Sequence, residues 1–106
     1  MEHLIWSPSE KRIARAAFER AVEVELSELM AEFKRRAAAA DTPEQMWALR
    51  KYLEHSQRDF DAKYDFRYSQ LLHVFGRLVR ERRVTEQQLQ GLAEDKLQYI
   101  RRIASL

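Results

Sequence analysis

The sequence predicts an all-α fold. Only two Gly and two Pro occur among 106 residues, while Ala, Leu, Glu, Arg and Gln are plentiful, so the chain favours long helices over strands and turns. Three stretches have the form of a capping box, the arrangement that begins many helices. The length suits one compact domain and is too short for two independent cores.

The first expected helix spans about residues 7–40. In the stretch SPSE at 7–10, Ser7 can act as the N-cap, Pro8 occupies the first helical position and Glu10 completes the capping box. At about 1.5 Å per residue this helix would be about 45 Å long, which exceeds the diameter of so small a domain. Its apolar stripe persists for several turns: Phe18, Val22, Leu26, Leu29 and Phe33. Two arrangements can cover the stripe, either a second copy of the chain or the second helix folded back within one monomer.

The second capping box begins the middle of the chain. TPEQ at 42–45 supplies Thr42 and Gln45, so a second helix is expected over 43–62 and a third over 64–83. Because no Gly or Pro lies between residues 44 and 75, these two helices are predicted to be nearly continuous, with at most a bend near 62–65.

The C-terminal part, 86–106, is expected to form a small helical head. Thr85 in TEQQ would cap a short helix that Gly91 ends, and a last amphipathic helix follows. Its apolar side would consist of Leu92, Leu97, Ile100 and Ile103.

The stretch DAKYDFRYSQLLHVF at 61–75 carries an unusual charge pattern. On a continuous helix, Asp61 would neighbour Asp65 and Lys63 would neighbour Arg67, and each like-charge pair costs about 0.2–0.5 kcal/mol. The charges border an apolar seam, so the pattern predicts ion pairs with another helix or subunit. The alternative is an ordinary surface on which local pairs such as Arg58 with Asp61 suffice.

The sequence gives no sign of catalysis, metal binding or membrane insertion. It contains no Cys, no leader sequence and no apolar stretch long enough to span a bilayer, so the protein is expected to be cytoplasmic. His3, His55 and His73 share no ligand spacing, and we therefore expect no metal and no cofactor. The glutamates of the first helix have no nucleophile nearby and are interpreted as a solvated face, so an enzyme is not expected.

Four segments resemble the fluorescence recovery protein family of cyanobacteria: MWALRKYL at 46–53, DAKYDFRYS at 61–69, VFGRLV at 74–79 and LAEDKLQYI at 92–100. The likeness extends from Trp6 to the end of the chain, and KYDxR at 63–67 is its most specific part. The resemblance implies a long helical hairpin that forms an elongated dimerisation region, with the C-terminal head beside it. It also implies a homodimeric regulator that binds the C-terminal domain of photoactivated orange carotenoid protein, speeds its return to the orange form and catalyses no covalent chemistry.

Two groups of candidate site residues follow from the charge pattern and the resemblance. The expected dimer interface and hairpin surface comprise Trp47, Arg50, Lys51, Arg58, Asp61, Lys63, Tyr64, Asp65 and Arg67. The expected partner surface of the head comprises His73, Arg77, Arg80, Lys96 and Tyr99.

The chain departs from the family pattern at several of these positions. The pattern has a His-Asp pair where Arg50 and Lys51 stand, an arginine at Gln57, an aromatic residue at His73 and a lysine at Tyr99. A cation at Lys51 would reverse any ion pair made there. The expected client is therefore the orange carotenoid protein, a homologue of its C-terminal domain, or a different protein.

Two other functions remain as alternatives to the protein-binding regulator. One is a purely structural dimer or tetramer without a client. The other is a basic helical nucleic-acid binder, disfavoured by the modest net charge of +2. It would use Arg80, Arg82, Arg83, Arg101 and Arg102.

Overall fold

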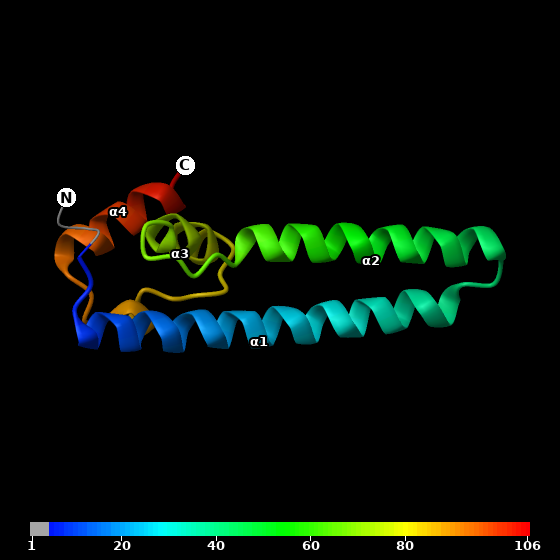
Figure 1. The fold of residues 1–106 in the computed structure, drawn as a ribbon, viewed down its shortest axis with the longest axis horizontal. Helices are drawn as coiled ribbons and strands as arrows, with labels where there is room; N and C mark the ends of the chain where they lie inside the picture. Colours follow the sequence, from blue (N-terminus) through cyan, green and yellow to red (C-terminus); the bar gives the residue numbers. More distant parts are fainter. Residues whose placement is uncertain (1–4) are drawn as a thin grey trace. The chain divides into compact units, whose positions relative to one another are not determined.

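A computed structural model describes residues 5–106 of the chain (Figure 1), and His3 lies outside the described residues. The described part is all-helical and contains no strand, which confirms the predicted fold class. Four α-helices and one short 3₁₀-helix follow one another: α1 (Pro8–Ala39), α2 (Pro43–Lys63), α3 (Leu71–Arg80), η2 (Gln87–Leu89) and α4 (Glu94–Ala104).

All three predicted capping boxes are formed. The Glu10 N–H donates to Ser7 Oγ at 3.1 Å, and the Ser7 N–H donates to Glu10 Oε1 at 3.0 Å. Thr42 and Gln45 exchange the same two bonds at 3.2 Å each. Thr85 and Gln88 exchange them at 2.8 and 3.2 Å. These bonds satisfy N–H groups that a helix start leaves without a partner, which is why the helix starts could be predicted from the sequence.

The predicted continuity of the second and third helices is wrong. α2 ends at Lys63, residues 64–67 have no regular structure, residues 68–70 form a turn, and α3 begins only at Leu71. In this connector the Phe66 ring packs edge-on against Phe18 with centroids 4.8 Å apart, and the Tyr64 ring does so at 5.4 Å. A helix would direct these alternating aromatic side chains to different sides. Packing against α1 therefore outweighs the local helix propensity.

The chain divides into two compact units. The first consists of Tyr64–Leu106 with the described part of Met1–Ala21. Helices α3 and α4 pack against each other here, and the largest fully buried side chains of the molecule belong to this unit: Leu71, Phe75, Leu78, Val84, Leu89 and Ile100. The first unit therefore has a hydrophobic core of its own.

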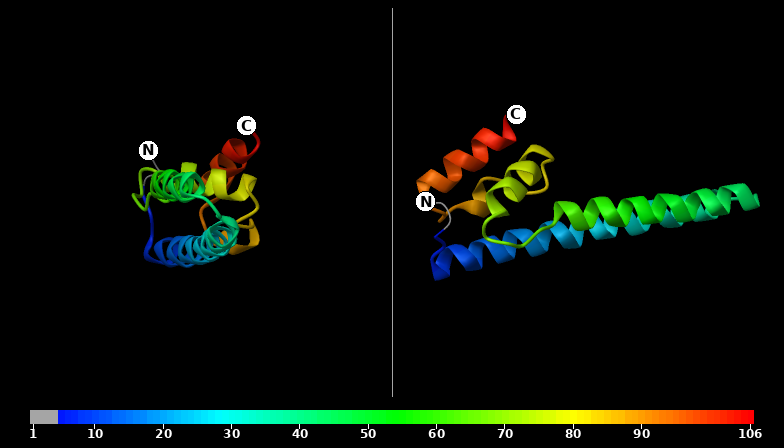
Figure 2. Two further views of the ribbon diagram at one scale, coloured as in Figure 1. Left: turned by 90° about the vertical axis from the view of Figure 1, so that its right-hand side faces the viewer. Right: turned by 45° about the horizontal axis from the view of Figure 1, so that its top comes forward.

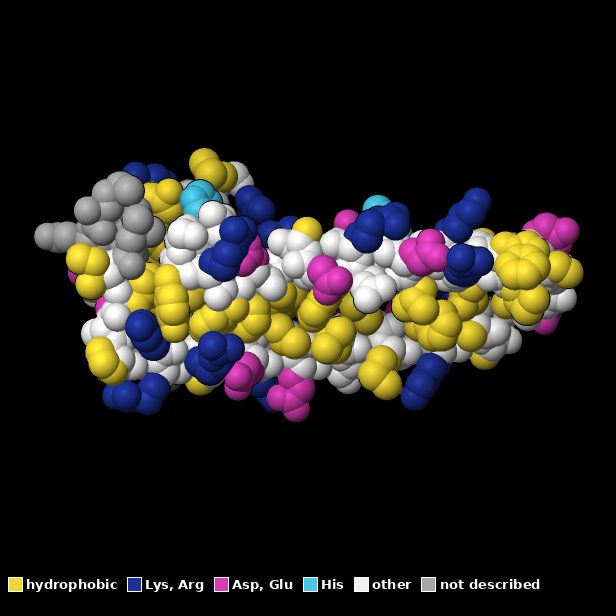
Figure 3. All heavy atoms as spheres, in the orientation of Figure 1, with side chains coloured by type: hydrophobic (Ala, Val, Ile, Leu, Met, Phe, Trp, Pro, Cys, Tyr) yellow, Lys and Arg dark blue, Asp and Glu magenta, His cyan; other side chains and the backbone are white. Residues whose placement is uncertain are grey.

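The second unit, Val22–Lys63, is a helical hairpin made of the C-terminal part of α1 and the whole of α2. The two helices run side by side and antiparallel (Figure 2). Lys63 is the one buried residue in this unit, all of whose residues the structure describes. Hydrophobic side chains instead gather at the surface along the hairpin (Figure 3). The second unit thus has an apolar face and no core.

Candidate protein-binding surfaces

The hairpin carries an apolar groove between its two helices. The groove has a volume of about 550 Å³. Its apolar lining comprises Leu26, Leu29, Met30, Phe33, Tyr52, Leu53 and Phe60. A second hollow, which shares Phe33 and Leu53 with the groove, is bordered by Met46 and Trp47. Trp47 is 60% exposed, an unusual position for so large an apolar side chain.

Several of the predicted interface residues are polar side chains of α2, and one of them lines the groove. Asp61 and Gln57 line the groove itself. Arg50 is exposed and its Nε lies 3.0 Å from Glu54 Oε1 of the same helix. For Lys51 and Arg58, both exposed, the structure of residues 5–106 gives no ion pair. Asp61 and Arg50 therefore place charges of both signs beside the groove and the second hollow.

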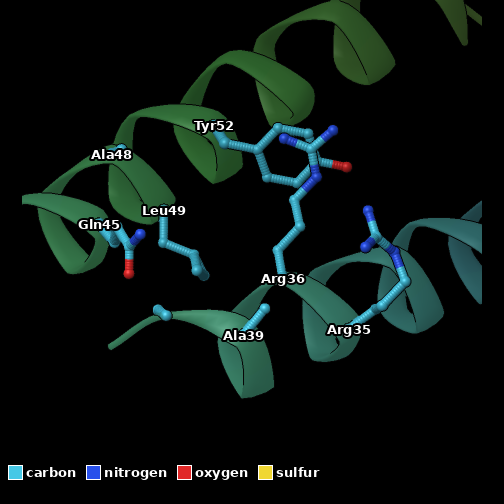
Figure 4. Close-up of a pocket in the computed structure, with 8 residues that line it drawn as sticks. Arg35, Arg36, Ala39, Gln45, Ala48, Leu49 and Tyr52 are labelled. Atoms are coloured by element: carbon cyan, nitrogen blue, oxygen red, sulfur yellow. The ribbon is translucent and has the colours of Figure 1, made fainter. Parts of the chain in front are cut away.

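A smaller hollow of about 260 Å³ lies near the end of the hairpin (Figure 4). Arg36 lies over the Tyr52 ring, with its guanidinium carbon 3.9 Å from the ring centroid. Arg35 and Arg36 both donate to Glu32, and these hydrogen bonds lower the pKa of Glu32 to about 2. Because the carboxylate neutralises much of the local charge, this hollow is a poor anion site.

The KYDxR segment forms contacts within the chain. Lys63 Nζ lies 2.7 Å from Glu25 Oε2, and both side chains are largely buried within the hairpin. In the first unit, the Tyr64 hydroxyl donates to the Ala21 carbonyl at 3.3 Å. The predicted pairs of like charges do not form, because residues 64–67 are not helical.

Arg67 instead contacts Asp65, two residues before it in the connector. Its Nε lies 2.9 and 3.0 Å from the two Asp65 oxygens. The Arg67 hydrogen bonds hold the pKa of Asp65 below its ordinary value. Asp65 and Arg67 therefore form a local ion pair in the structure.

The head presents a mixed aromatic and basic surface formed by α3 and α4. The rings of His73 and Tyr99 meet edge-to-face with centroids 5.6 Å apart, and the Tyr99 hydroxyl lies 3.4 Å from His73 Nε2. Arg77 Nε lies 2.9 Å from Glu81, and Arg80 reaches the carbonyl of Leu106 at 3.5 Å. Four of the five predicted head residues thus lie on these two helices with polar groups at the surface.

Lys96, the fifth predicted head residue, is 2% exposed. Its ammonium group donates to the Ile5 carbonyl at 2.7 Å and lies 3.1 Å from Glu10 Oε2 and 5.2 Å from the centroid of the Trp6 ring. Burial and these three internal contacts argue against the predicted contact of Lys96 with a partner. The residue instead connects α4 to the N-terminal segment.

Glu10 is the residue whose importance the sequence did not indicate. Besides capping α1, its Oε2 accepts the Ala93 N–H at 2.9 Å, at the start of α4. Burial alone would raise the pKa of Glu10, but the hydrogen bonds from Ser7, Ala93 and Lys96 leave it below its ordinary value. The capping box was the only local signal, since Ala93 and Lys96 lie more than eighty positions away in the sequence.

The arginines proposed for nucleic-acid binding are partly neutralised. Arg101 donates to Glu86 at 2.6 Å and to Glu94 at 3.2 Å, and these bonds raise its pKa. Arg83 Nε lies 3.5 Å from Glu81, while Arg82 occupies a turn with φ of 63°. Such pairing leaves less free positive charge for a phosphate backbone than the sequence indicates.

Among residues 5–106, the structure contains no group of three His, Asp or Glu side chains that could hold a metal ion. No helix in this part of the chain combines the length and the apolar character that crossing a membrane requires.

Comparison with known proteins gives concordant results. Residues 6–104 match the family described as photoprotection regulator fluorescence recovery protein. The chain is 34% identical over 101 residues to the fluorescence recovery protein of Synechocystis sp. PCC 6803, which covers 95% of this chain and 93% of that protein. Among solved structures, that of the Fremyella diplosiphon fluorescence recovery protein superposes with a TM-score of 0.91 at 32% identity. The Synechocystis structure superposes with a TM-score of 0.90 at 33% identity, and each comparison covers 96% of this chain and 100% of the other.

Proposed function

The chain belongs to the fluorescence recovery protein family of photoprotection regulators, and from this premise we propose that it accelerates the return of photoactivated orange carotenoid protein to the resting orange form. It does so by binding the C-terminal domain of that protein, as the sequence resemblance implies. The observation that carries the proposal is the family match, which spans residues 6–104 and therefore both the hairpin and the head.

The proposed action is non-enzymatic and depends on differential binding. A protein that binds the activated and relaxed states of its partner equally well alters no rate. Acceleration requires tighter binding to the transition state of the relaxation, and a tenfold effect requires about 1.4 kcal/mol of additional binding free energy. No covalent step and no cofactor is needed.

The proposed working form is a homodimer in which the apolar faces of two hairpins cover each other. The support is the contrast between the two units, because the first has a buried core whereas the apolar residues of Val22–Lys63 are exposed or half-buried. A two-fold interface places the same patch on both partners, so a second copy supplies a matching apolar surface. Trp47 is the proposed anchor, since tryptophan is enriched among residues that dominate binding energies. A tetramer built from such dimers is the alternative assembly.

The charged rim of the groove supports the same arrangement. Asp61 lines the groove, and Arg50 lines the second hollow beside it. In an antiparallel arrangement of two copies, carboxylates and cations of opposite rims can meet. Such pairs would contribute to the choice of partner and register more than to affinity.

We place the surface that binds the protein partner on the head. His73 and Tyr99 supply aromatic area there, and Arg77 and Arg80 supply guanidinium groups that suit carboxylates of an acidic partner. Affinity should therefore fall as the salt concentration rises. A further contact on the hairpin would use Trp47, Arg50 and Lys51.

The experiment measures recovery of the orange absorbance after illumination, with and without the chain. We expect faster recovery with the unaltered protein and a reduced effect with the double variant Arg77→Gln/Arg80→Gln. The matched control, Arg20→Gln/Lys34→Gln, removes two exposed cations of α1 and should recover as fast as the unaltered protein. If a dimeric, folded protein in tenfold excess leaves the recovery rate unchanged, the client is a different protein.

A further inference from the structure

A shallow basic groove lies on the first turns of α1, outside the head surface formed by α3 and α4. Its volume is about 400 Å³. It is lined by Lys11, Arg12, Arg15, Ala16, Glu19 and Tyr68. All of these residues belong to the first unit, and the proposed function above makes no use of them.

Aromatic rings support two of the three cations. The Arg15 guanidinium carbon lies 3.8 Å from the centroid of the Phe66 ring, and Lys11 Nζ lies 5.1 Å from that of Tyr68. A ring face attracts a cation without taking up its hydrogen-bond donors. These rings therefore restrict the side chains before a ligand arrives, and such preorganisation reduces the entropy lost on binding.

The positive charge of the groove is only partly compensated. Arg15 Nε lies 3.9 Å from Glu19 Oε1, with the two side chains 54% and 66% exposed. For Lys11 and Arg12, the described part of the chain offers no carboxylate within ion-pair distance. The groove therefore retains cations that can donate hydrogen bonds to carboxylates of another molecule.

We propose that this groove binds a short acidic segment of another protein. Carboxylates of that segment contact Arg12 and Arg15, and a basic side chain that follows them in the segment contacts Glu19. Residues 12, 15 and 19 share one face of the helix and span about 10 Å, the length of about three residues of extended peptide. The order of two cations followed by a carboxylate favours a polypeptide, which can carry charges of both signs, over a uniformly negative polymer or surface. A nucleic acid or an anionic membrane would place uniform negative charge against Glu19 as well.

The probe is a short amidated peptide containing Glu-Glu-Ser-Lys, titrated into the ¹⁵N-labelled full chain at low ionic strength. Amide NMR shifts should change at residues 11–19 and 68, and the fitted Kd should increase about fivefold in Lys11→Gln/Arg12→Gln. That variant keeps the stack of Arg15 on Phe66, so the fold should be retained. The control Arg20→Gln/Lys34→Gln removes the same charge from α1 and should bind as the unaltered chain does.

Substitution of Glu19 tests the order of charges. Glu19→Gln should weaken binding of the lysine-containing peptide and strengthen binding of an otherwise identical peptide with Glu in place of Lys. The proposal is overturned if both double variants bind with the same affinity, or if Glu19→Gln affects both peptides alike. It is also overturned if a hexathymidine oligonucleotide or phosphatidylglycerol vesicles bind the groove more tightly than the peptide.

Discussion

A single buried carboxylate, Glu10, joins three segments of the first unit. It accepts the Ser7 N–H at the start of α1, the Ala93 N–H at the start of α4 and the ammonium group of Lys96. Lys96 in turn donates to the Ile5 carbonyl. A buried ion pair is tolerated when the remaining donors and acceptors are also satisfied, and these contacts meet that condition. Glu10 and Lys96 thus fix how the N-terminal segment, α1 and α4 meet.

The substitution Glu10→Gln should destabilise the protein by about 3 kcal/mol, because it leaves the buried ammonium group of Lys96 without its counter-ion. Urea unfolding at pH 7 and a fixed protein concentration measures the difference. Glu19→Gln on the exposed side of the same helix is the control and should change stability by less than about 0.5 kcal/mol. Equal stability of the two variants would contradict the role assigned to Glu10.

The same carboxylate predicts how stability depends on pH. Because the pKa of folded Glu10 is lowered from its ordinary 4.5, its contribution is fully present above that value and is lost as the pH falls through the lower folded pKa. The stability difference between the unaltered protein and Glu10→Gln should therefore shrink as the pH falls below about 4.5. Other carboxylates with lowered pKa, such as Asp65, are common to both proteins and cancel in the comparison. A difference that stays constant over this range would refute the assignment.

At the scale of elements, Gly76 sets how closely α3 and α4 approach. A Cβ at this position would lie 2.6 Å from Ile103 Cβ and closer still to Ile103 Cγ2. Gly76→Ala should therefore destabilise the protein by about 1–3 kcal/mol, although alanine favours a helix over glycine by about 1 kcal/mol. Thermal or urea unfolding measures the effect.

A double-mutant cycle separates the clash from other effects of the substitution. Ile103→Ala removes the side chain that the new methyl group would meet, so Gly76→Ala should cost much less in that background. Additive costs of the two substitutions would show that the contact between α3 and α4 is not the cause.

The helix starts were predictable from the sequence, and the connector between α2 and α3 was not. Capping boxes such as that of Thr42 and Gln45 are local, and the structure forms each of them. The break at residues 64–70 depends on Phe18, whose ring meets those of Tyr64 and Phe66, 46 and 48 positions later in the sequence. The alternation of Tyr64, Phe66 and Tyr68 was the available signal, but the absence of Gly and Pro led to the interpretation of a continuous helix.

The candidate surfaces were also predictable only in part from the sequence. The exposed position of Arg50 follows from its charge, whereas Trp47 was expected at an interface and is 60% exposed in the single chain. The burial of Lys96 does not follow from any local pattern, because its acceptors Ile5 and Glu10 belong to the other end of the chain. Charged residues are usually exposed, so a single sequence favours the wrong environment for a lysine of this kind.

At the scale of the whole molecule, the contrast between the units predicts the oligomeric state. The apolar residues along the hairpin, Leu53 among them, stay exposed or half-buried in the described part of the chain. A helical hairpin without a core gains little stability from helix propensity alone. Two copies that share their apolar faces gain the missing burial. We therefore expect light scattering at about 10 μM to report the mass of a dimer.

Leu53→Asp should shift this equilibrium strongly towards the monomer. Leu53 is 48% exposed and lines both the apolar groove and the second hollow, and burial of a leucine side chain contributes about 2 kcal/mol. A two-fold interface contains the residue twice, so the dimer loses about 4 kcal/mol of association free energy. This loss raises the Kd of the dimer about a thousandfold. Leu106→Asp is the matched control, because it makes the same chemical change at a residue that is 84% exposed and outside the hairpin. If both variants keep the dimer mass, or if the unaltered chain is a folded monomer, the apolar face of the hairpin has a different occupant.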